Sequence, residues 1–203
     1  MATATVLKKG RKFDQVLEGA RTVFMRDGFE GASVDDITRE AGVSKATLYS
    51  YFPDKRLLFL EVARAECARQ ADAAIQTIDM TAAPREALTA AARRITSFIT
   101  SDFGQRVYRI CVAECDRFPD VGRAFYQSGP LVVRQRLADY LTAATARGQL
   151  AVDDIPLAAD QFAELCKANL QARTLFGATP CAPAEVERTI VGAVDMFLAR
   201  YAV

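Results

Sequence analysis

The sequence predicts an all-α protein, because alanine is abundant, helix-breaking residues are few and apolar residues recur at helical spacing. Of the 203 residues, 36 are Ala, while Pro and Gly number only seven and 11. Ala is the strongest helix former, whereas Gly and Pro are the weakest. Hydrophobic residues make up 51% and charged residues 25% of the chain, which is typical of folded domains. This length can bury one full core or two small ones.

Three helices are expected in the first 53 residues. The first follows a basic cluster at 8–12 and ends at Asp27-Gly28, where Gly can adopt the left-handed cap conformation. Its apolar stripe consists of Phe13, Val16, Leu17, Ala20, Val23 and Phe24. Ser33 can cap the second helix, which Gly42-Val43 breaks. Ser44 can cap the third helix, at 45–52, before Pro53 stops it.

A long helix at 55–78 should connect this part to the rest, because no Gly or Pro occurs between Pro53 and Pro84. At about 1.5 Å per residue it would exceed about 30 Å in length. Gly, Pro and Asp mark the boundaries of further helices at 84–101, 104–117, 121–127, 130–147, 156–176 and 183–201. We therefore divide the chain into a small head (1–53) and a larger helical body (54–203).

Two short helices joined by a turn with Gly form a helix-turn-helix pattern, in which the second helix enters the major groove of DNA. In the third helix, Leu48 and Phe52 can pack against the second helix. That packing leaves a small, hydrogen-bonding outward face of Ala46, Thr47, Tyr49 and Ser50. Small residues permit close approach to base edges, and hydroxyl groups can bond bases or phosphates. Lys45 and Lys55 add positive charge at the two ends.

The stretch from Val34 to Lys55 closely resembles the DNA-binding head of the TetR family of bacterial transcriptional regulators. The resemblance rests on Ala41-Gly42-Val43-Ser44, on Leu48-Tyr49-x-Tyr51-Phe52 and on Lys55, and it covers roughly residues 11–62. It implies a homodimer that reads a palindromic operator in double-stranded DNA. It also implies a small-molecule effector, bound in the variable body, that releases the DNA.

The resemblance implies specific DNA contacts by matching position. It assigns base or adjacent backbone contacts to Lys45, Ala46 and Thr47, phosphate contacts to Tyr49, Tyr51 and Lys55, and secondary phosphate contacts to Ser33, Thr38 and Ser44. Many relatives have Gly where this chain has Ala46, whose methyl could contact a thymine methyl or limit the approach. Tyr49 and Tyr51 could instead simply pack within a three-helix bundle.

The body carries the expected effector pocket and the expected dimer interface. Candidate pocket residues in the central helices are Phe98, Phe103, Tyr108, Cys111, Phe118, Phe125 and Tyr126. Core packing is the alternative for each of them. The last two helices carry broad apolar stripes that should form a helical hairpin, which in the family pairs with its twofold mate. The candidate interface residues are Phe162, Leu165, Phe176, Val186, Ile190, Val194, Phe197 and Tyr201.

Composition excludes several chemistries. The absence of His removes Ser-His and Cys-His nucleophile pairs and His-ligated metals, so we expect no catalytic residues, metal or cofactor. An enzyme in the body is one alternative. Cys111 and Cys115 share a helix face, so a thiol-redox regulator is another, although both fit a buried stripe. An activator cannot be distinguished from a repressor by sequence.

Charge and segment patterns complete the sequence analysis. Residues 1–60 carry ten basic and eight acidic side chains, a net charge of +2. The cluster of Lys8, Lys9, Arg11 and Lys12 could reach phosphates or be a solvated terminus. The chain shows neither a secretory signal nor an apolar run long enough to cross a bilayer. A reducing cytoplasm is the expected location, without membrane association.

Overall fold

The computed structural model describes residues 10–75, 79–116, 118–177 and 179–203, without the side chains of 67–75 and 121. Over these residues it confirms the all-α prediction, with ten helices and a single isolated β-bridge between Leu150 and Ala202. The helices are α1 (Arg11–Gly31), α2 (Val34–Ala41), α3 (Lys45–Tyr51), α4 (Lys55–Ile75), α5 (Pro84–Thr100), α6 (Asp102–Glu114), α7 (Pro119–Ser128), α8 (Pro130–Ala146), α9 (Ile155–Leu175) and α10 (Pro183–Tyr201).

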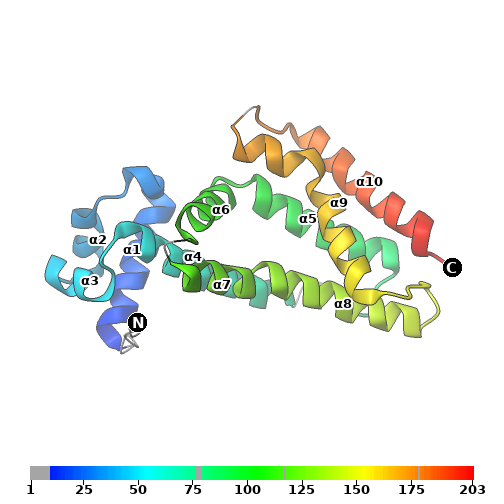
Figure 1. Cartoon of the computed structure of the whole chain (residues 1–203), viewed down its shortest axis with the longest axis horizontal. Coiled ribbons are helices and arrows are strands. Elements are labelled where there is room, and N and C mark those ends of the chain that lie inside the picture. Colours follow the sequence, from blue (N-terminus) through cyan, green and yellow to red (C-terminus); the bar gives the residue numbers. More distant parts are fainter. Residues whose placement is uncertain (1–9, 76–78, 117, 178) are drawn as a thin grey trace.

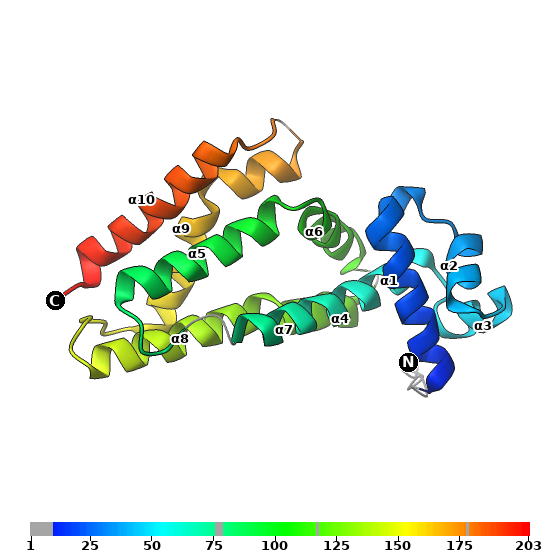
Figure 2. The ribbon, with the colours of Figure 1, turned by 180° about the vertical axis from the view of Figure 1, so that it is seen from behind.

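The molecule is elongated, with α1, α2 and α3 forming a head at one end (Figure 1). Helix α4 leaves the head and runs beside α7 into the body, where α10 lies at the opposite edge with the C-terminus (Figure 2). At about 1.5 Å per residue, the 21 residues of α4 span about 30 Å. The last part of the predicted helix, 76–78, lies outside the described residues.

Local hydrogen bonds define the helices of the head. The Ser33 and Ser44 side chains accept hydrogen bonds from the Asp36 and Thr47 amides at 3.0 and 3.1 Å, so each serine caps a helix as predicted. Gly42 ends α2 in the left-handed conformation, with φ of 62°. Ile37 of α2 and Leu48 of α3 are fully buried, and their burial fixes which side of each helix faces the core.

Two glycines of α1 shape the head. Gly28 has φ of 71° and interrupts the helix where the sequence predicts its end, although α1 continues after this kink to Gly31. Gly19 lies so close to α2 that a Cβ atom there would be 2.6 Å from both the amide nitrogen and the Cβ of Ala41. The absence of a side chain at Gly19 therefore lets α1 and α2 cross closely.

The hydrophobic core of the head continues past residue 53. It includes Leu58 and Phe59 from α4, and also Val107 and Cys111 from α6. Arg56 of α4 forms an ion pair of 2.5 Å with the buried carboxylate of Glu114 at the end of α6. The head is thus joined to the body by shared packing rather than by a flexible linker.

A second core fills the body between α5, α8, α9 and α10. The rings of Phe162 and Phe197 meet edge to face, with centroids 5.2 Å apart. Tyr140 is almost entirely buried, and its hydroxyl donates a hydrogen bond of 2.9 Å to the Ala82 carbonyl. The first contact joins the two helices of the C-terminal hairpin, and the second joins α8 to the segment before α5.

From α5 to α10, three helix boundaries differ from the prediction by two residues or more. Helix α6 starts at Asp102 rather than 104, because Ser101 caps it by accepting a hydrogen bond from the Gly104 amide at 3.0 Å. It ends at Glu114 rather than 117. Helix α7 starts two residues earlier than predicted because Pro119 occupies the first turn, where a missing amide hydrogen costs nothing.

The sequence analysis did not predict the bend in α9. Ala168 has φ of 31° and ψ of −130°, so the helix is interrupted there (Figure 1). The segment after the bend reaches α6, where Arg109 donates hydrogen bonds to the Thr174 and Leu175 carbonyls at 2.8 and 3.0 Å. Helix α6 therefore contacts both the head and the end of α9.

Candidate nucleic-acid interface and cavity

Helix α3 presents a short polar face to solvent. Leu48 is fully buried and fixes the rotation of the helix, so Ala46, Tyr49 and Ser50 are exposed and Thr47 is half-buried at the edge. The Thr47 hydroxyl lies 2.9 Å from that of Ser44, and Ser50 donates to the Thr47 carbonyl at 2.7 Å. These bonds orient the hydroxyl groups while each oxygen keeps lone pairs for a further partner.

Several candidate contact residues also have roles within the head. Thr38 is buried, and its hydroxyl donates to the Asp35 carbonyl at 3.0 Å. The Tyr51 ring is half-buried and meets Phe13 edge to face, at 5.6 Å between centroids. Tyr49, by contrast, is exposed. Of the two tyrosines, Tyr49 is therefore the one whose ring is available to an external partner.

Lys55 differs most from the role that the resemblance implied. Its ammonium donates to the carbonyls of Phe29 and Ala32 at 2.9 and 3.0 Å, and it lies 4.5 Å from the centre of the Phe29 ring. The carbonyls belong to the C-terminal end of α1, where a cation is favoured. In this structure Lys55 joins the first and fourth helices, and a phosphate contact would require it to leave those carbonyls.

An acidic partner for Lys45 was missed by the sequence analysis. The Lys45 ammonium lies 2.6 Å from the carboxylate of Asp35 in the first turn of α2. Hydrogen bonding to this carboxylate raises the pKa of Lys45, so the ammonium is charged at neutral pH. Asp35 adjoins Asp36, whose amide donates to the capping residue Ser33, and only the fold brings Asp35 next to the start of α3.

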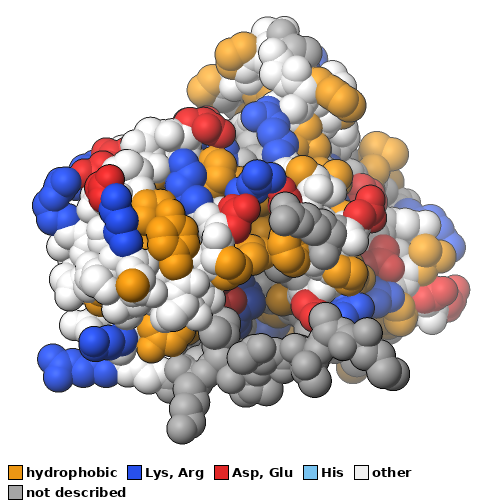
Figure 3. All heavy atoms as spheres, turned by 60° about the vertical axis from the view of Figure 1, so that its left-hand side comes forward, with side chains coloured by type: hydrophobic (Ala, Val, Ile, Leu, Met, Phe, Trp, Pro, Cys, Tyr) orange, Lys and Arg blue, Asp and Glu red, His pale blue; other side chains and the backbone are white. Residues whose placement is uncertain are grey.

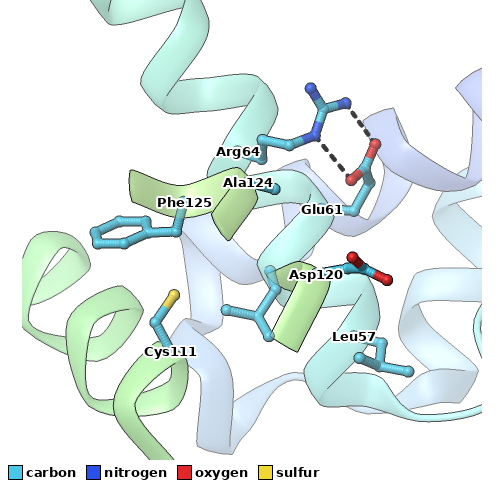
Figure 4. A pocket seen from close by; sticks show the side chains of 8 residues that line it. Leu57, Glu61, Arg64, Cys111, Asp120, Ala124 and Phe125 are labelled. Atoms are coloured by element: carbon cyan, nitrogen blue, oxygen red, sulfur yellow. Dashed lines mark hydrogen bonds and ion pairs between the residues drawn. The ribbon is translucent and has the colours of Figure 1, made fainter. Parts of the chain in front are cut away.

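The body contains a cavity of about 260 Å³ between α4, α6 and α7 (Figure 4). Its lining comprises Leu57, Leu60, Glu61, Arg64, Cys111, Asp120, Ala124 and Phe125. Glu61 and Arg64 form two parallel hydrogen bonds of 2.6 and 2.9 Å, shown by dashed lines in Figure 4. The cavity is thus apolar on one side and bears an ion pair on the other.

Only Cys111 and Phe125 of the predicted pocket set line this cavity. Phe103 instead packs on Phe59 of the head core, at 6.2 Å between ring centroids. Tyr108 and Tyr126 are exposed, and Phe98 and Phe118 are half-buried at other places. Two of the seven predicted residues therefore line the cavity, and α4, which the prediction did not include, supplies half of the lining.

The prediction for the dimer interface requires a correction. Phe162, Ile190, Val194 and Phe197 are buried in the core of their own chain, so these four cannot also meet a partner. Leu165, Val186 and Tyr201 are partly buried against that core. Phe176 is 87% exposed. The outward apolar residues of the hairpin are Leu157, Phe176, Val191 and Met196, of which the prediction named only Phe176.

Both the head and the body match known protein families. The family model described as "Bacterial regulatory proteins, tetR family" matches residues 16–62. The family model described as "AefR-like transcriptional repressor, C-terminal domain" matches residues 86–203, more than half of the chain. The chain belongs to the TetR family. It is accordingly a DNA-binding transcriptional regulator with a helix-turn-helix head, in a family whose members are not enzymes.

Solved TetR structures support this assignment over the whole chain. A TetR-family regulator of Mesorhizobium loti MAFF303099 is 30% identical, with a TM-score of 0.78, covering 95% of this chain and 98% of that one. The flavonoid-responsive regulator FrrA is 35% identical, with a TM-score of 0.68, covering 96% and 98%. The repressor AcnR of Corynebacterium efficiens is 39% identical, but the match covers only 36% of this chain and 38% of AcnR.

The cysteines of this TetR chain do not form a cluster in the described region. Cys111 and Cys166 are buried and Cys115 and Cys181 are half-buried, while the Cys67 side chain lies outside the described residues. Burial raises the pKa of Cys166 to about 12, which keeps it protonated at neutral pH. Within the described residues, no three metal-ligating side chains come together and no helix could span a membrane.

Proposed function

We propose that this TetR-family chain is a homodimeric repressor that reads a palindromic operator with α3 and leaves it when a small molecule occupies the body. The outward face of α3 carries the proposal, because it combines a capped N-terminus, small residues and an exposed Tyr49. Repression is supported by the AefR-like repressor domain and by AcnR. The activator FasR of Mycolicibacterium smegmatis, 32% identical over 96 residues, supports activation as the alternative.

Selection of genomic DNA fragments by the purified protein tests operator binding. We expect a palindromic site, bound in the nanomolar range with a steep loss of affinity as salt rises. Thr47→Val should change the base preference, whereas Tyr49→Ala should weaken binding to all sequences alike. Transcription from a promoter carrying the site would then fall on addition of the protein. A rise would favour activation, and binding to all fragments alike would contradict the proposal.

Action on chromosomal DNA also supports a cytoplasmic location.

We propose that the dimer forms through the outward side of α9 and α10. Leu157, Val191 and Met196 are exposed there in a single chain, and the family pairs its last helices in this way. A dimer also supplies the two half-sites that a palindrome requires. Val191→Asp would bury a carboxylate in that interface, so sedimentation should show a monomer. Asp195→Asn, a change at an already polar position nearby, is the control and should leave a dimer.

The cavity between α4, α6 and α7 is the proposed effector site. Leu57, Leu60 and Phe125 favour an apolar ring, while the Glu61–Arg64 pair can bond hydroxyl or carbonyl groups. The flavonoid-responsive relative FrrA supports a phenolic aromatic effector. Such a compound should raise the melting temperature of the wild type. Ala124→Phe, which fills the cavity, should abolish the shift, and Tyr126→Ala on the same helix should keep it. Retention of the full shift by Ala124→Phe would contradict the site.

Helix α6 is the proposed link between effector and operator. Its Cys111 lines the cavity and belongs to the head core, and its Glu114 pairs with Arg56, which follows the reading helix by five residues. By linkage, an effector that weakens operator binding must itself bind more weakly to the DNA complex, by the same factor. In Glu114→Gln this factor should fall toward one while each ligand alone still binds. An unchanged factor would contradict the role of this pair.

A further inference from the structure

Three cations of the described head lie beside neighbouring carboxylates. Arg26 pairs with Asp27, Arg39 with Asp36 and Lys45 with Asp35, at 2.8, 2.8 and 2.6 Å. Figure 3, which brings the head forward, shows blue and red side chains interspersed rather than one continuous basic surface. Sequence-independent DNA binding depends on free Lys and Arg that neutralise phosphates. Each cation that is paired in this way is less available to arbitrary DNA.

The pair of Lys45 and Asp35 differs from the other two by its location. Lys45 is the first residue of α3, and Asp35 comes from α2, so this pair joins the two helices of the helix-turn-helix. The other two pairs each lie within one helix. Residues in the first turn of a recognition helix contact base edges. Lys45 is therefore at the end of α3 that reads bases.

Both side chains of this pair are open to solvent, with exposed fractions of 56% for Lys45 and 63% for Asp35. Neither is held by a buried environment, so DNA can approach the ammonium without displacing the core. Lysine is a flexible point charge that contacts any phosphate within reach unless something restrains it. The Asp35 carboxylate supplies that restraint, and its own negative charge is repelled by phosphates.

We propose that Asp35 is a positioning residue that keeps the Lys45 ammonium off the phosphates and directs it to the O6 and N7 acceptors of a guanine in each half-site. Lysine donating to these acceptors is a common base-specific contact. Asp35 thereby raises the ratio of operator affinity to random-DNA affinity rather than the operator affinity itself. This inference rests on the proposed operator binding. It adds to that proposal the base that Lys45 contacts, and it gives a role to Asp35, a residue that was not among the predicted DNA contacts.

Binding of the full-length protein to its selected operator and to a scrambled duplex of equal length tests the proposal. In Asp35→Asn the freed Lys45 should strengthen binding to the scrambled duplex by about tenfold, and the salt slope there should steepen by about 0.9 per head. Operator affinity should change by less than about threefold, so the affinity ratio falls. The guanine preference at the contacted position should flatten, and it should flatten in Lys45→Ala as well.

Glu40→Gln is the matched control, because Glu40 is an exposed carboxylate on the same helix with no ion pair to Lys45. It removes the same charge and should move both affinities by the same small factor. In a Lys45→Ala background, Asp35→Asn should do no more than Glu40→Gln.

Two results would overturn the role of Asp35 while leaving the operator intact. One is an equal change in both affinities for Asp35→Asn and Glu40→Gln. The other is an undiminished effect of Asp35→Asn when Lys45 is Ala, because Asp35 would then act through its charge alone. A wild type that binds operator and scrambled DNA alike would instead overturn operator binding, and this inference with it. Melting curves of every variant verify that the head is folded.

Discussion

The head and the C-terminal hairpin are both built from amphipathic helices, yet their surfaces follow from sequence in different ways. In the head, Ser33 and Ser44 cap their helices and Leu48 faces inward, so the exposed side of α3 is fixed by local signals. In the hairpin, the strongest apolar residues, such as Phe162 and Phe197, face the chain's own core. The surface that remains open to a partner carries scattered apolar residues, such as Val191, which lie outside the buried apolar stripe of their helix.

This difference indicates what an apolar stripe can and cannot say. A stripe shows which side of a helix is buried, but not whether the neighbour is the same chain or a second copy. A capped helix of seven residues has only one way to bury Leu48, so its outward face follows directly. A helix of 19 residues such as α10 has room for two apolar sides.

The largest expected effect separates core from surface in the hairpin. Phe197 is 2% exposed and packs on Phe162, so Phe197→Ala should lower the free energy of unfolding by about 3 to 5 kcal/mol. Met196, its exposed neighbour, is the control: Met196→Ala should change the stability of the isolated chain by less than about 0.5 kcal/mol. Urea denaturation of both variants in the monomeric Val191→Asp background measures this. Similar losses for the two would mean that the hairpin faces are assigned wrongly.

A somewhat smaller effect tests close packing in the head. A methyl group at Gly19 would lie 2.6 Å from the backbone nitrogen of Ala41, so Gly19→Ala must push α1 and α2 apart. Overpacking of this kind costs about 1 to 3 kcal/mol. At Gly31, near the end of the same helix, an added methyl meets only the Asp27 Cβ at 3.5 Å. Gly31→Ala should therefore be tolerated, and equal destabilisation of the two variants in urea would refute the close crossing.

Much of the fold could be predicted because its boundaries depend on local chemistry. Proline in the first turn and serine at the cap fix where helices start, so the predicted and observed starts differ by two residues or fewer from α2 to α10. The bend at Ala168 could not be predicted, because an alanine with positive φ is held by its surroundings and not by its own preference.

The candidate site divides in the same way. Ala46, Thr47, Tyr49 and Ser50 follow from the helical wheel of a short helix. The partners of Lys55 and Lys45 could not be predicted, because Phe29 is 26 residues away from Lys55 and Asp35 belongs to another helix. Long polar side chains find their partners only after the helices have packed.

A moderate effect tests whether the cap determines the reading face. Ser44→Ala removes the side chain that accepts from the Thr47 amide, which costs about 1 kcal/mol. The loss should appear as faster amide exchange in α3 and weaker binding to every duplex. Ser50→Ala is the control. The Ser50 hydroxyl donates to the Thr47 carbonyl, which lies within the helix, and does not cap its N-terminus. If Ser50→Ala loosened α3 as much as Ser44→Ala, the cap would not be what sets this face.

The smallest effect concerns the tip of the hairpin and depends on pH. Two hydrogen bonds from Arg173, at 2.7 and 3.1 Å, together with one from the Ala182 amide, lower the pKa of Glu185 from 4.5 to about 2. A carboxyl group with a lowered pKa in the folded state stabilises the fold fully above the pKa of the unfolded chain. Its contribution should therefore be complete above about pH 5 and decline as the pH falls toward 2.

Glu185→Gln removes this titration and keeps the size of the side chain. The variant should be less stable than the wild type at pH 7. The difference should shrink between pH 5 and 2, because protonation of Glu185 then removes from the wild type the stabilising charge that the variant lacks at every pH. Added salt should reduce the difference at pH 7, since the pair is partly exposed to solvent. Glu187→Gln is the control, because its pair with Arg93 is more exposed, and it should lower the stability at pH 7 by less than Glu185→Gln does. A constant difference between wild type and Glu185→Gln across this range would show that Arg173 holds the hairpin tip by shape and not by charge.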